Sequence, residues 1–240
     1  MKHFLLITAI TLSVLWPGPA LSGDTLRINT SIKPPFSTHN ETGFFDLIIK
    51  ELGKRIDLKV ELVRLPPERA LYSVNEGISN GELPRIAGLQ KEYPNLIQIE
   101  EKIIDYNFVA FSKNASSVTS WEDLADKRVG YLHGWKIFDN NVPESAHKSK
   151  PNNPSSLIDM LDEGRIDVAL YERYAGWKMI RTHGHSRVKE CPQPLAVKPM
   201  YLYLNKGCKW LVPAVTETLR EMKKDGTYER IAKQTLDQQT

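Results

Sequence analysis

The feature that most constrains the fold is a repeated alternation of short β-branched runs with longer amphipathic runs. Residues 26–32 have the composition of a strand, and residues 43–56 follow with apolar side chains at helical spacing. The same elements return later, where a helix is predicted at 154–165 and a strand at 166–171. Strands that alternate with helices are typical of βαβ units, which build mainly parallel sheets with helices on both faces. We therefore predict an α/β fold.

A second feature is the stretch of small polar residues at 114–120, which separates two such series and predicts a linker between two lobes. The next segment is expected to form a helix with Ser120 as its N-cap and Asp123 three residues later. Other strands are predicted at 58–65, 82–89, 96–103, 107–113, 128–134, 187–191 and 200–206, with a break at Asp105 and Tyr106. Other helices are predicted at 66–77, 173–184, 210–226 and 227–236.

The N-terminal segment has the pattern of a secretory signal. Lys2 and His3 precede an apolar run at 4–16, which is too short to span a bilayer comfortably and is broken by Pro, Gly and Pro. Ala, Leu and Ser at 20–22 then place small residues two apart, as at a signal-peptidase site. We predict a signal peptide at residues 1–22 and an exported mature chain. The alternative is an uncleaved anchor.

Charge and cysteine content narrow the classes of function. Without Lys2 the formal net charge falls from +3 to +2, and the chain has no block of like charges. This argues against a segment that binds nucleic acid and against a polybasic membrane patch. In an oxidising compartment Cys191 and Cys208 are expected to form a disulfide. Two unlinked thiols are the alternative, because the sequence does not show how far apart the two Cα atoms lie.

Sequence motifs for catalysis and cofactor binding are missing. The chain has no G-x-S-x-G, phosphate-binding loop, dinucleotide fingerprint or H-E-x-x-H. His183 and His185 stand on a predicted helix-to-strand turn without carboxylates nearby in sequence, so we expect a plain surface turn and no metal. The pattern therefore favours binding over catalysis, with no cofactor.

Ligands of open α/β sheets lie beyond the carboxyl ends of the strands, and several side chains are predicted there. Phe36 follows two prolines that stiffen its loop, so it is a candidate wall for a ligand, or else it packs under that loop. Arg85 and Gly88 come at the end of the third predicted strand. Because apolar residues flank Arg85, its guanidinium must either face water or hold an acid.

The second series of predicted strands and helices also has candidate ligand-binding residues at its strand ends. Gly134, Trp135 and Lys136 are expected to open a helix whose free N–H groups attract an anion, although Trp135 is alternatively a plug of the lobe core. Tyr171 and Glu172 end a strand, and Glu172 is a candidate partner for a ligand ammonium. The other interpretation of Glu172 is a solvated residue in the first turn of the next helix.

Taken in order, the segments LRINTSIKPPFS, GFFDLIIKELGKRI, WEDLADKRVGYLHGW, LDEGRIDVALYER and LREMKKDGTYERIAKQ resemble the bacterial extracellular solute-binding proteins of family 3, the periplasmic receptors for polar amino acids. The resemblance covers nearly the whole mature chain. It implies a two-lobed periplasmic-binding-protein-like fold, with residues 23–112 plus 199–240 in lobe 1 and 113–198 in lobe 2. It also implies a monomer in the periplasm that closes on an amino-acid-like ligand and docks on an inner-membrane ABC permease.

The chain departs from this family around the ligand. The family's Thr-x-x-x-Arg segment after the third strand is replaced by GLQKEYPNL, so we expect Arg85 to grip the ligand carboxylate instead. Arg69 is the rival, although an exposed helix-face charge is the favoured interpretation of it. Gly134 matches the family's anion loop by position, with Trp135 in place of its threonine, and Glu172 matches the acid that receives the ammonium.

Two other functions remain open at this point. One is a sensor or signalling module of the same fold, with a membrane partner other than a permease. The other is a dehydratase-like enzyme on this scaffold, in which Glu172 or His133 would serve as general acid.

Overall fold

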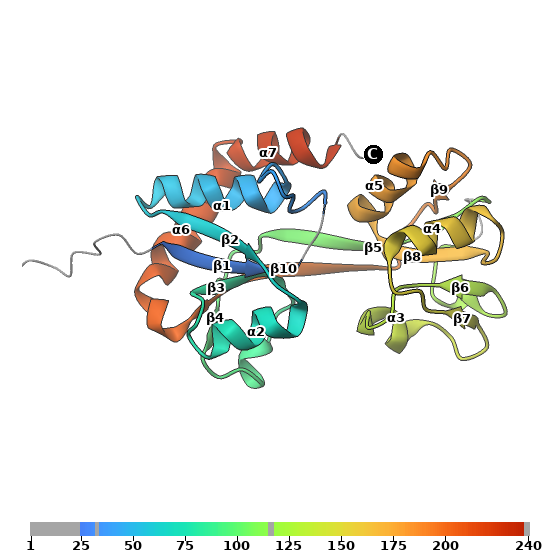
Figure 1. Cartoon of the computed structure of the whole chain (residues 1–240), viewed down its shortest axis with the longest axis horizontal. Coiled ribbons are helices and arrows are strands. Elements are labelled where there is room, and N and C mark those ends of the chain that lie inside the picture. Colours follow the sequence, from blue (N-terminus) through green and yellow to red (C-terminus); the bar gives the residue numbers. More distant parts are fainter. Residues whose placement is uncertain (1–24, 32–33, 115–117, 238–240) are drawn as a thin grey trace, which may run out of the picture.

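The computed structural model describes residues 25–31, 34–114 and 118–237, and it divides into two lobes joined by two long strands (Figure 1). These strands are β5 (Ile104–Ser112) and β10 (Ala196–Asn205), which pair antiparallel. The first lobe contains β1–β4, α1, α2, α6 and α7, and the second contains β6–β9 and α3–α5. The two-lobed α/β fold predicted from the sequence is therefore confirmed.

The strands of the described residues form one sheet in the order β2-β1-β3-β10-β5-β8-β6-β7, with β4 on β10 and β9 on β5. Parallel pairs lie in its outer parts, where β1 pairs with β2 and β3, and β6 pairs with β7 and β8. The remaining strands are β1 (Leu26–Thr30), β2 (Val60–Arg64), β3 (Gly81–Arg85), β4 (Leu96–Gln98), β6 (Arg128–Gly130), β7 (His147–Ser149), β8 (Val168–Glu172) and β9 (Lys189–Glu190).

Helices cover both faces of this sheet (Figure 1). The α-helices are α1 (Phe44–Arg55), α2 (Pro67–Asn75), α3 (Lys136–Asn141), α4 (Pro154–Asp162), α5 (Arg173–His183), α6 (Val212–Lys224) and α7 (Thr227–Thr235). Short 3-10 turns occur as η1 (Leu89–Lys91), η2 (Glu122–Leu124) and η3 (Lys206–Leu211). The last two α-helices return to the first lobe, where Tyr228 of α7 packs edge-on against Phe44 of α1 and Arg55 pairs with Asp225.

The apolar face of α1 shows why this helix forms and where it packs. Phe44, Phe45, Ile48 and Leu52 are all within 1% of full burial. Burial of a side chain of this size contributes about 1.5–3 kcal/mol relative to exposure. Gly53 lets the helix lie close to β2, because a Cβ there would approach a methyl group of Val60 to 2.5 Å.

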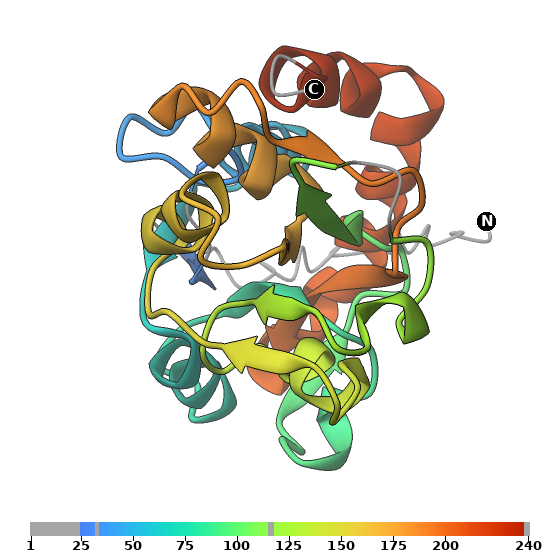
Figure 2. The ribbon, with the colours of Figure 1, turned by 90° about the vertical axis from the view of Figure 1, so that its right-hand side faces the viewer.

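The second lobe is built in the same way around β5 and β8, and Figure 2 looks at it end-on. Leu157, Ile158 and Leu161 of α4 are fully buried in a cluster that also contains Phe111 of β5. A Cβ on Gly176 would lie 2.3 Å from the Phe111 ring, so this glycine sets the close packing of α5 on β5.

Several predicted elements differ from the structure. β5 runs through Asp105 and Tyr106, which had been expected to interrupt it, because Tyr106 points into the core while Asp105 binds Lys102 outside. The helix expected after Ser120 is only a 3-10 turn, although Asp123 accepts the Ser120 N–H at 2.9 Å as the predicted capping contact requires. The strands predicted to reach Leu89 and Gly134 end earlier, at Arg85 and Gly130.

The predicted disulfide is not formed in the structure. Cys191 lies buried in the second lobe, where its N–H donates to the carbonyl of Ala110. Cys208 lies in η3 of the first lobe, with its sulfur 3.4 Å from the side-chain nitrogen of Asn80. The two cysteines belong to different lobes, and each is a free thiol.

The predicted signal peptide at 1–22 lies outside the described residues. Among residues 25–31, 34–114 and 118–237, no helix has the length and apolar character that crossing a bilayer requires. The residue boundaries proposed for the two lobes remain a prediction.

Candidate functional site

The loop after β1 is fastened by a buried carboxylate, Asp46, in the first turn of α1. Its oxygens accept bonds from the Ser37 hydroxyl at 2.8 Å, from the Thr38 N–H at 2.8 Å and from the Gly43 N–H at 2.9 Å. Arg64 of β2 reaches the same carboxylate at 3.2 Å and the Ser37 hydroxyl at 2.9 Å. Sequence reasoning missed Asp46, although an acid three residues after a helix N-cap is a known capping signal.

Phe36, which this loop carries, is only 2% exposed. Its ring stacks on Phe45 at 5.3 Å, lies 5.1 Å from Tyr106 of β5 and meets Tyr174 of α5 edge-on at 6.2 Å. Phe36 therefore packs on side chains of the first lobe, a joining strand and the second lobe. The expected role of Phe36 as a ligand wall remains a prediction. Only the edge of its ring that these neighbours leave uncovered could contact a ligand.

Arg85 already has an acid within its own strand. Its Nε donates to Glu82 at 2.8 Å, and its Nη2 donates to the same oxygen and to the Pro67 carbonyl at 2.6 Å. The Glu82 side chain is 1% exposed, and burial raises its pKa to about 7 although the charge of Arg85 opposes the shift. A ligand carboxylate at Arg85 would thus meet a guanidinium that a carboxylate and a carbonyl already hold.

A pair of buried oxygens lies beside this ion pair. Asn29 of β1 is the register partner of Glu82 of β3, so both side chains lie on one face of the sheet. Asn29 donates to the Ala70 carbonyl at 3.0 Å, whereas its Oδ1 and the Glu82 Oε2 have no hydrogen-bond partner among the described residues. Two buried acceptors in this position favour a donor, such as an ammonium group, a water or a proton on Glu82.

The other first-lobe candidates have ordinary surroundings. Arg69 is exposed on α2, in line with the interpretation favoured from the sequence. Gly88 has a φ of 92°, and its N–H donates to the side-chain oxygen of Gln98 at 3.2 Å. That N–H is therefore engaged within the loop.

In the second lobe Trp135 belongs to an aromatic cluster. Its ring stacks on Phe138 at 5.6 Å with an interplanar angle of 3°, lies 4.8 Å from Tyr171 and meets Phe108 edge-on at 6.0 Å. The Trp135 side chain is half-buried, and Tyr171 is 8% exposed. This packing fits the lobe-core alternative for Trp135 and leaves one part of the indole accessible.

The turn before α3 does not present the predicted set of free donors. The Trp135 N–H donates to the Leu132 carbonyl at 3.3 Å, and the Lys136 N–H donates to the Gly134 carbonyl at 3.1 Å. Gly134 has a φ of 82°, as the tight turn requires, and the Lys136 side chain is exposed. The expected anion loop therefore remains a prediction that would need these N–H groups to reorient.

Glu172, at the end of β8, is a second buried carboxyl besides Glu82. It is 1% exposed, and its Oε2 caps α5 by accepting the Ala175 N–H at 2.9 Å, while its Oε1 has no partner within the described part of the chain. Burial raises its pKa to about 8, opposed by the backbone N–H groups of α5. The solvated alternative for Glu172 is wrong, because the carboxyl is enclosed, although it does serve the helix N-terminus.

Tyr106 accompanies Glu172 and was not singled out from the sequence. Glu172 is the register partner of Phe108, and Tyr106 comes two residues before Phe108 in β5, so its side chain lies on the same face of the sheet. Its hydroxyl is buried and has no partner in the described ranges. Burial, and then the charge of Glu172, raise the pKa of Tyr106 well above its usual range, so this hydroxyl keeps its proton.

The site thus contains two buried carboxyls, each with one unpaired oxygen. Glu82 lies in the first lobe on β3, and Glu172 lies in the second on β8, with β10 and β5 between them in the sheet. Such a set favours a small ligand with a positively charged end. A separate hollow of about 330 Å³ lies between the 34–43 loop, Lys178 and α7, and none of the predicted ligand residues lines it.

The chain is similar in sequence to known amino-acid-binding proteins. No family model matches the chain. The histidine-binding periplasmic protein of Escherichia coli K12 is 24% identical over 255 aligned residues, covering 99% of this chain and 98% of that protein. The L-cystine-binding protein TcyA of Bacillus subtilis is 22% identical over 214 residues, covering 83% and 76%. The chain is thus similar, over most of its length, to these two amino-acid-binding proteins.

Solved structures show that this relationship extends to the fold. The GluR0 ligand-binding core complexed with L-glutamate has a TM-score of 0.78 at 15% identity and covers 90% of this chain and 99% of its own. An ancestral amino-acid-binding protein described as a precursor of cyclohexadienyl dehydratase has a TM-score of 0.69 at 21% identity, covering 88% and 95%. The solute-binding-protein fold therefore extends over most of the described residues, and the resemblance stated from the sequence is confirmed.

Proposed function

We propose that the protein is a periplasmic solute-binding receptor, which captures a small amino-acid-like ligand by closure of its lobes and delivers it to an inner-membrane ABC permease. Its relatives are named for binding histidine and cystine, and its fold is that of amino-acid-binding proteins. The proposed lobes are 23–112 plus 199–240 and 113–198, with residues 1–22 as the signal peptide. Closure would bend β5 and β10, the two strands that join the lobes.

The observation that carries this proposal is the unpaired oxygen of Glu172 beside the buried hydroxyl of Tyr106. A ligand ammonium would supply the missing donor and would favour the ionised form of Glu172. The aromatic rings of Phe36 and Trp135 would then border the apolar part of the ligand.

Arg85 remains the proposed partner of the ligand carboxylate, provided that Glu82 releases it. The Glu82 carboxylate competes for the same guanidinium, and its pKa of about 7 means that a proton removes that competition near neutral pH. Protonation of Glu82 on ligand binding would release Arg85 towards the ligand and leave the carboxyl neutral in its buried place. Arg69 is the rival because it is exposed on the neighbouring helix α2.

The test is a thermal-shift screen of the mature chain with amino acids, small peptides, dicarboxylates and polyamines, followed by calorimetry on each hit. A ligand at 100 times its Kd should stabilise the protein by about 2.7 kcal/mol. The variant Glu172→Gln should weaken binding about 10-fold or more by removing the ammonium partner. The exposed Glu61→Gln serves as its control.

Comparison of Arg85→Ala with Arg69→Ala locates the carboxylate, because only the true partner should abolish binding. Stabilisation by amino acids that survives Glu172→Gln unchanged would contradict the proposed site. A screen in which no compound stabilises the chain would contradict the receptor proposal and favour a sensor that binds a membrane partner. Turnover of a prephenate-like substrate would instead point to an enzyme on this scaffold.

A further inference from the structure

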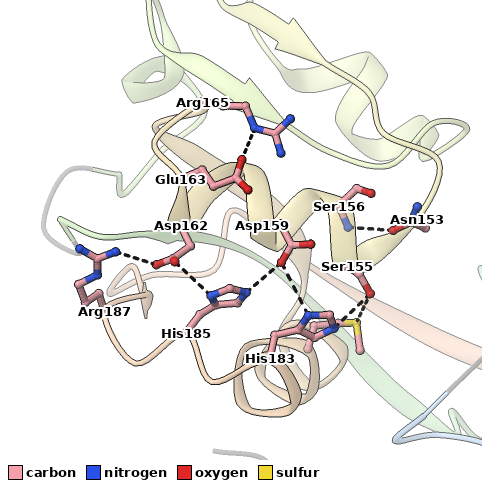
Figure 3. A network of polar contacts seen from close by, with 11 residues as sticks. Asn153, Ser155, Ser156, Asp159, Asp162, Glu163, Arg165, His183, His185 and Arg187 are labelled. Carbon is pink, nitrogen blue, oxygen red and sulfur yellow. Dashed lines mark hydrogen bonds and ion pairs between the residues drawn. The ribbon is translucent and has the colours of Figure 1, made fainter.

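A cluster of imidazole and carboxylate groups lies in the second lobe, outside the candidate ligand site (Figure 3). His183 ends α5, and His185 follows it after the single turn residue Gly184. Asp159 and Asp162 lie on the neighbouring helix α4, three residues apart and therefore on one face. The packing of α4 beside α5 brings the two pairs together.

The distances within this cluster suit a metal ion. Asp159 Oδ1 lies 3.0 Å from His185 Nε2 and 3.7 Å from His183 Nδ1. One ligand atom from each of the three residues lies within 4.8 Å of the other two. The two imidazole rings are nearly parallel, at 14°, with centroids 5.8 Å apart. Two ligand atoms bound to one tetrahedral zinc at 2.0–2.1 Å stand about 3.3 Å apart, so side-chain adjustments suffice to admit the ion.

A second layer of groups supports the two imidazoles from behind. His185 Nδ1 lies 3.3 Å from Asp162 Oδ2, and His183 Nε2 lies 3.2 Å from the Ser155 hydroxyl. Arg187 holds Asp162 from the other side at 3.4 Å. Histidines that bind metals usually direct their second nitrogen to a carboxylate or another polar group, which fixes the ring and its tautomer.

We propose that Asp159, His183 and His185 form a binding site for a Zn²⁺-class transition-metal ion. Two imidazoles with one carboxylate favour zinc, nickel, copper or cobalt over calcium and magnesium, which prefer oxygen ligands. Their side chains are 39%, 30% and 15% exposed, so an ion can enter from solvent and keep water in its fourth position.

The proposal changes the expectation of a metal-free surface turn. Near His183 and His185 in sequence there is no carboxylate, and Asp159 lies 26 residues before His185. The bound ion would tie the C-terminal end of α5 to α4. Because it binds the folded chain, it would stabilise the lobe in proportion to the logarithm of its concentration above Kd.

The experiment uses the mature chain without an affinity tag, stripped with EDTA and dialysed, and titrated with ZnCl₂ by calorimetry and with CoCl₂ by absorption spectroscopy. We expect one saturable site in the micromolar range or tighter, visible cobalt bands and a rise in Tm with added zinc. His183→Ala and His185→Ala should each weaken binding about 100-fold, and Asp162→Asn should weaken it about 10-fold to 100-fold through the ring orientation. His147→Ala and His133→Ala are the matched controls and should bind normally.

Circular dichroism and Tm in EDTA verify that each variant is folded, and Asp162→Asn keeps the side-chain shape in case a histidine variant does not fold. Two results would overturn the proposal. The first is the lack of saturable zinc binding by the tag-free chain, which would leave a hydrogen-bond network between the imidazoles and carboxylates. The second is binding that persists undiminished in His183→Ala and His185→Ala.

Discussion

Arg85 donates two bonds to the buried carboxylate of Glu82, three residues earlier on the same strand. The charge that stands among apolar neighbours in the sequence is therefore matched inside the fold. The pairing also explains how a carboxyl with 1% exposure is tolerated in β3. Removing each of these charges from water costs free energy, and the attraction to the other charge reduces that cost.

The first prediction concerns this pair. Arg85→Ala removes the cation beside buried Glu82 and so raises the pKa of that carboxyl above 7, which should lower the free energy of unfolding by about 1.4 kcal/mol at pH 8. The loss should be smaller at pH 5, because Glu82, whose pKa is about 7 even beside Arg85, is then protonated. Urea denaturation of the variant and the wild type at both pH values measures the difference.

The double variant Arg85→Ala with Glu82→Gln is the control for this interpretation. It removes the buried charge together with its partner, so most of the loss at pH 8 should be recovered. An equal loss at pH 5 and pH 8 would show that Arg85 acts through packing or through its bond to Pro67 instead.

The second prediction concerns Glu172. Its pKa is raised from 4.5 to about 8 by burial, so its folded form holds a proton more tightly than its unfolded form. The stability that results is fully present below pH 4.5 and is lost as pH rises through 8. Glu172→Gln should remove this contribution to the pH dependence and be more stable than wild type by about 2 kcal/mol at pH 9.

Stability curves of wild type and Glu172→Gln from pH 5 to pH 9 test this, since other titrating groups cancel in the difference between them. Glu61→Gln, which changes an exposed strand residue, should run parallel to wild type. A difference between Glu172→Gln and wild type that stays constant with pH would contradict the raised pKa.

The third prediction concerns Asp46, which accepts three bonds from the loop that carries Phe36. Asp46→Asn replaces one acceptor oxygen by a donor facing N–H or O–H groups and removes the partner of Arg64. We expect a loss of about 3 kcal/mol and faster proteolytic cleavage within residues 37–43. Ser37→Ala removes one hydroxyl only and should cost about 1 kcal/mol. Equal cleavage of Asp46→Asn and wild type would exclude this carboxylate as the anchor.

Much of the fold could be predicted because each helix and most strands carry their own periodic pattern. α5 is an example, since its predicted end at Gly184 coincides with a residue at a φ of 72°. β5 was divided wrongly because Asp105 looked like a break, whereas it occupies an outward position of a continuous strand. Strand propensity depends only on the residue type, whereas here the burial of the neighbouring Tyr106 side chain keeps the strand continuous.

The partners of the site residues could not be predicted in the same way. Residues three apart on a regular strand point to opposite faces, so Glu82 was not a natural partner for Arg85. The register of β3 against β10 shifts between Tyr201 and Tyr203, which breaks that alternation. His185 and Asp159 likewise meet only because α4 and α5 pack together.

The last prediction concerns the cysteines. Because Cys191 and Cys208 are free in different lobes, a reductant should leave the Tm of the chain unchanged, and the unfolded, unreduced chain should titrate two thiols. In the folded chain Cys208 should react faster with a thiol reagent, because Cys191 is buried and burial raises its pKa. The variant Cys191→Ser identifies the slow thiol. An unreduced chain without reactive thiols, and with a Tm that falls on reduction, would instead restore the disulfide expected from the sequence.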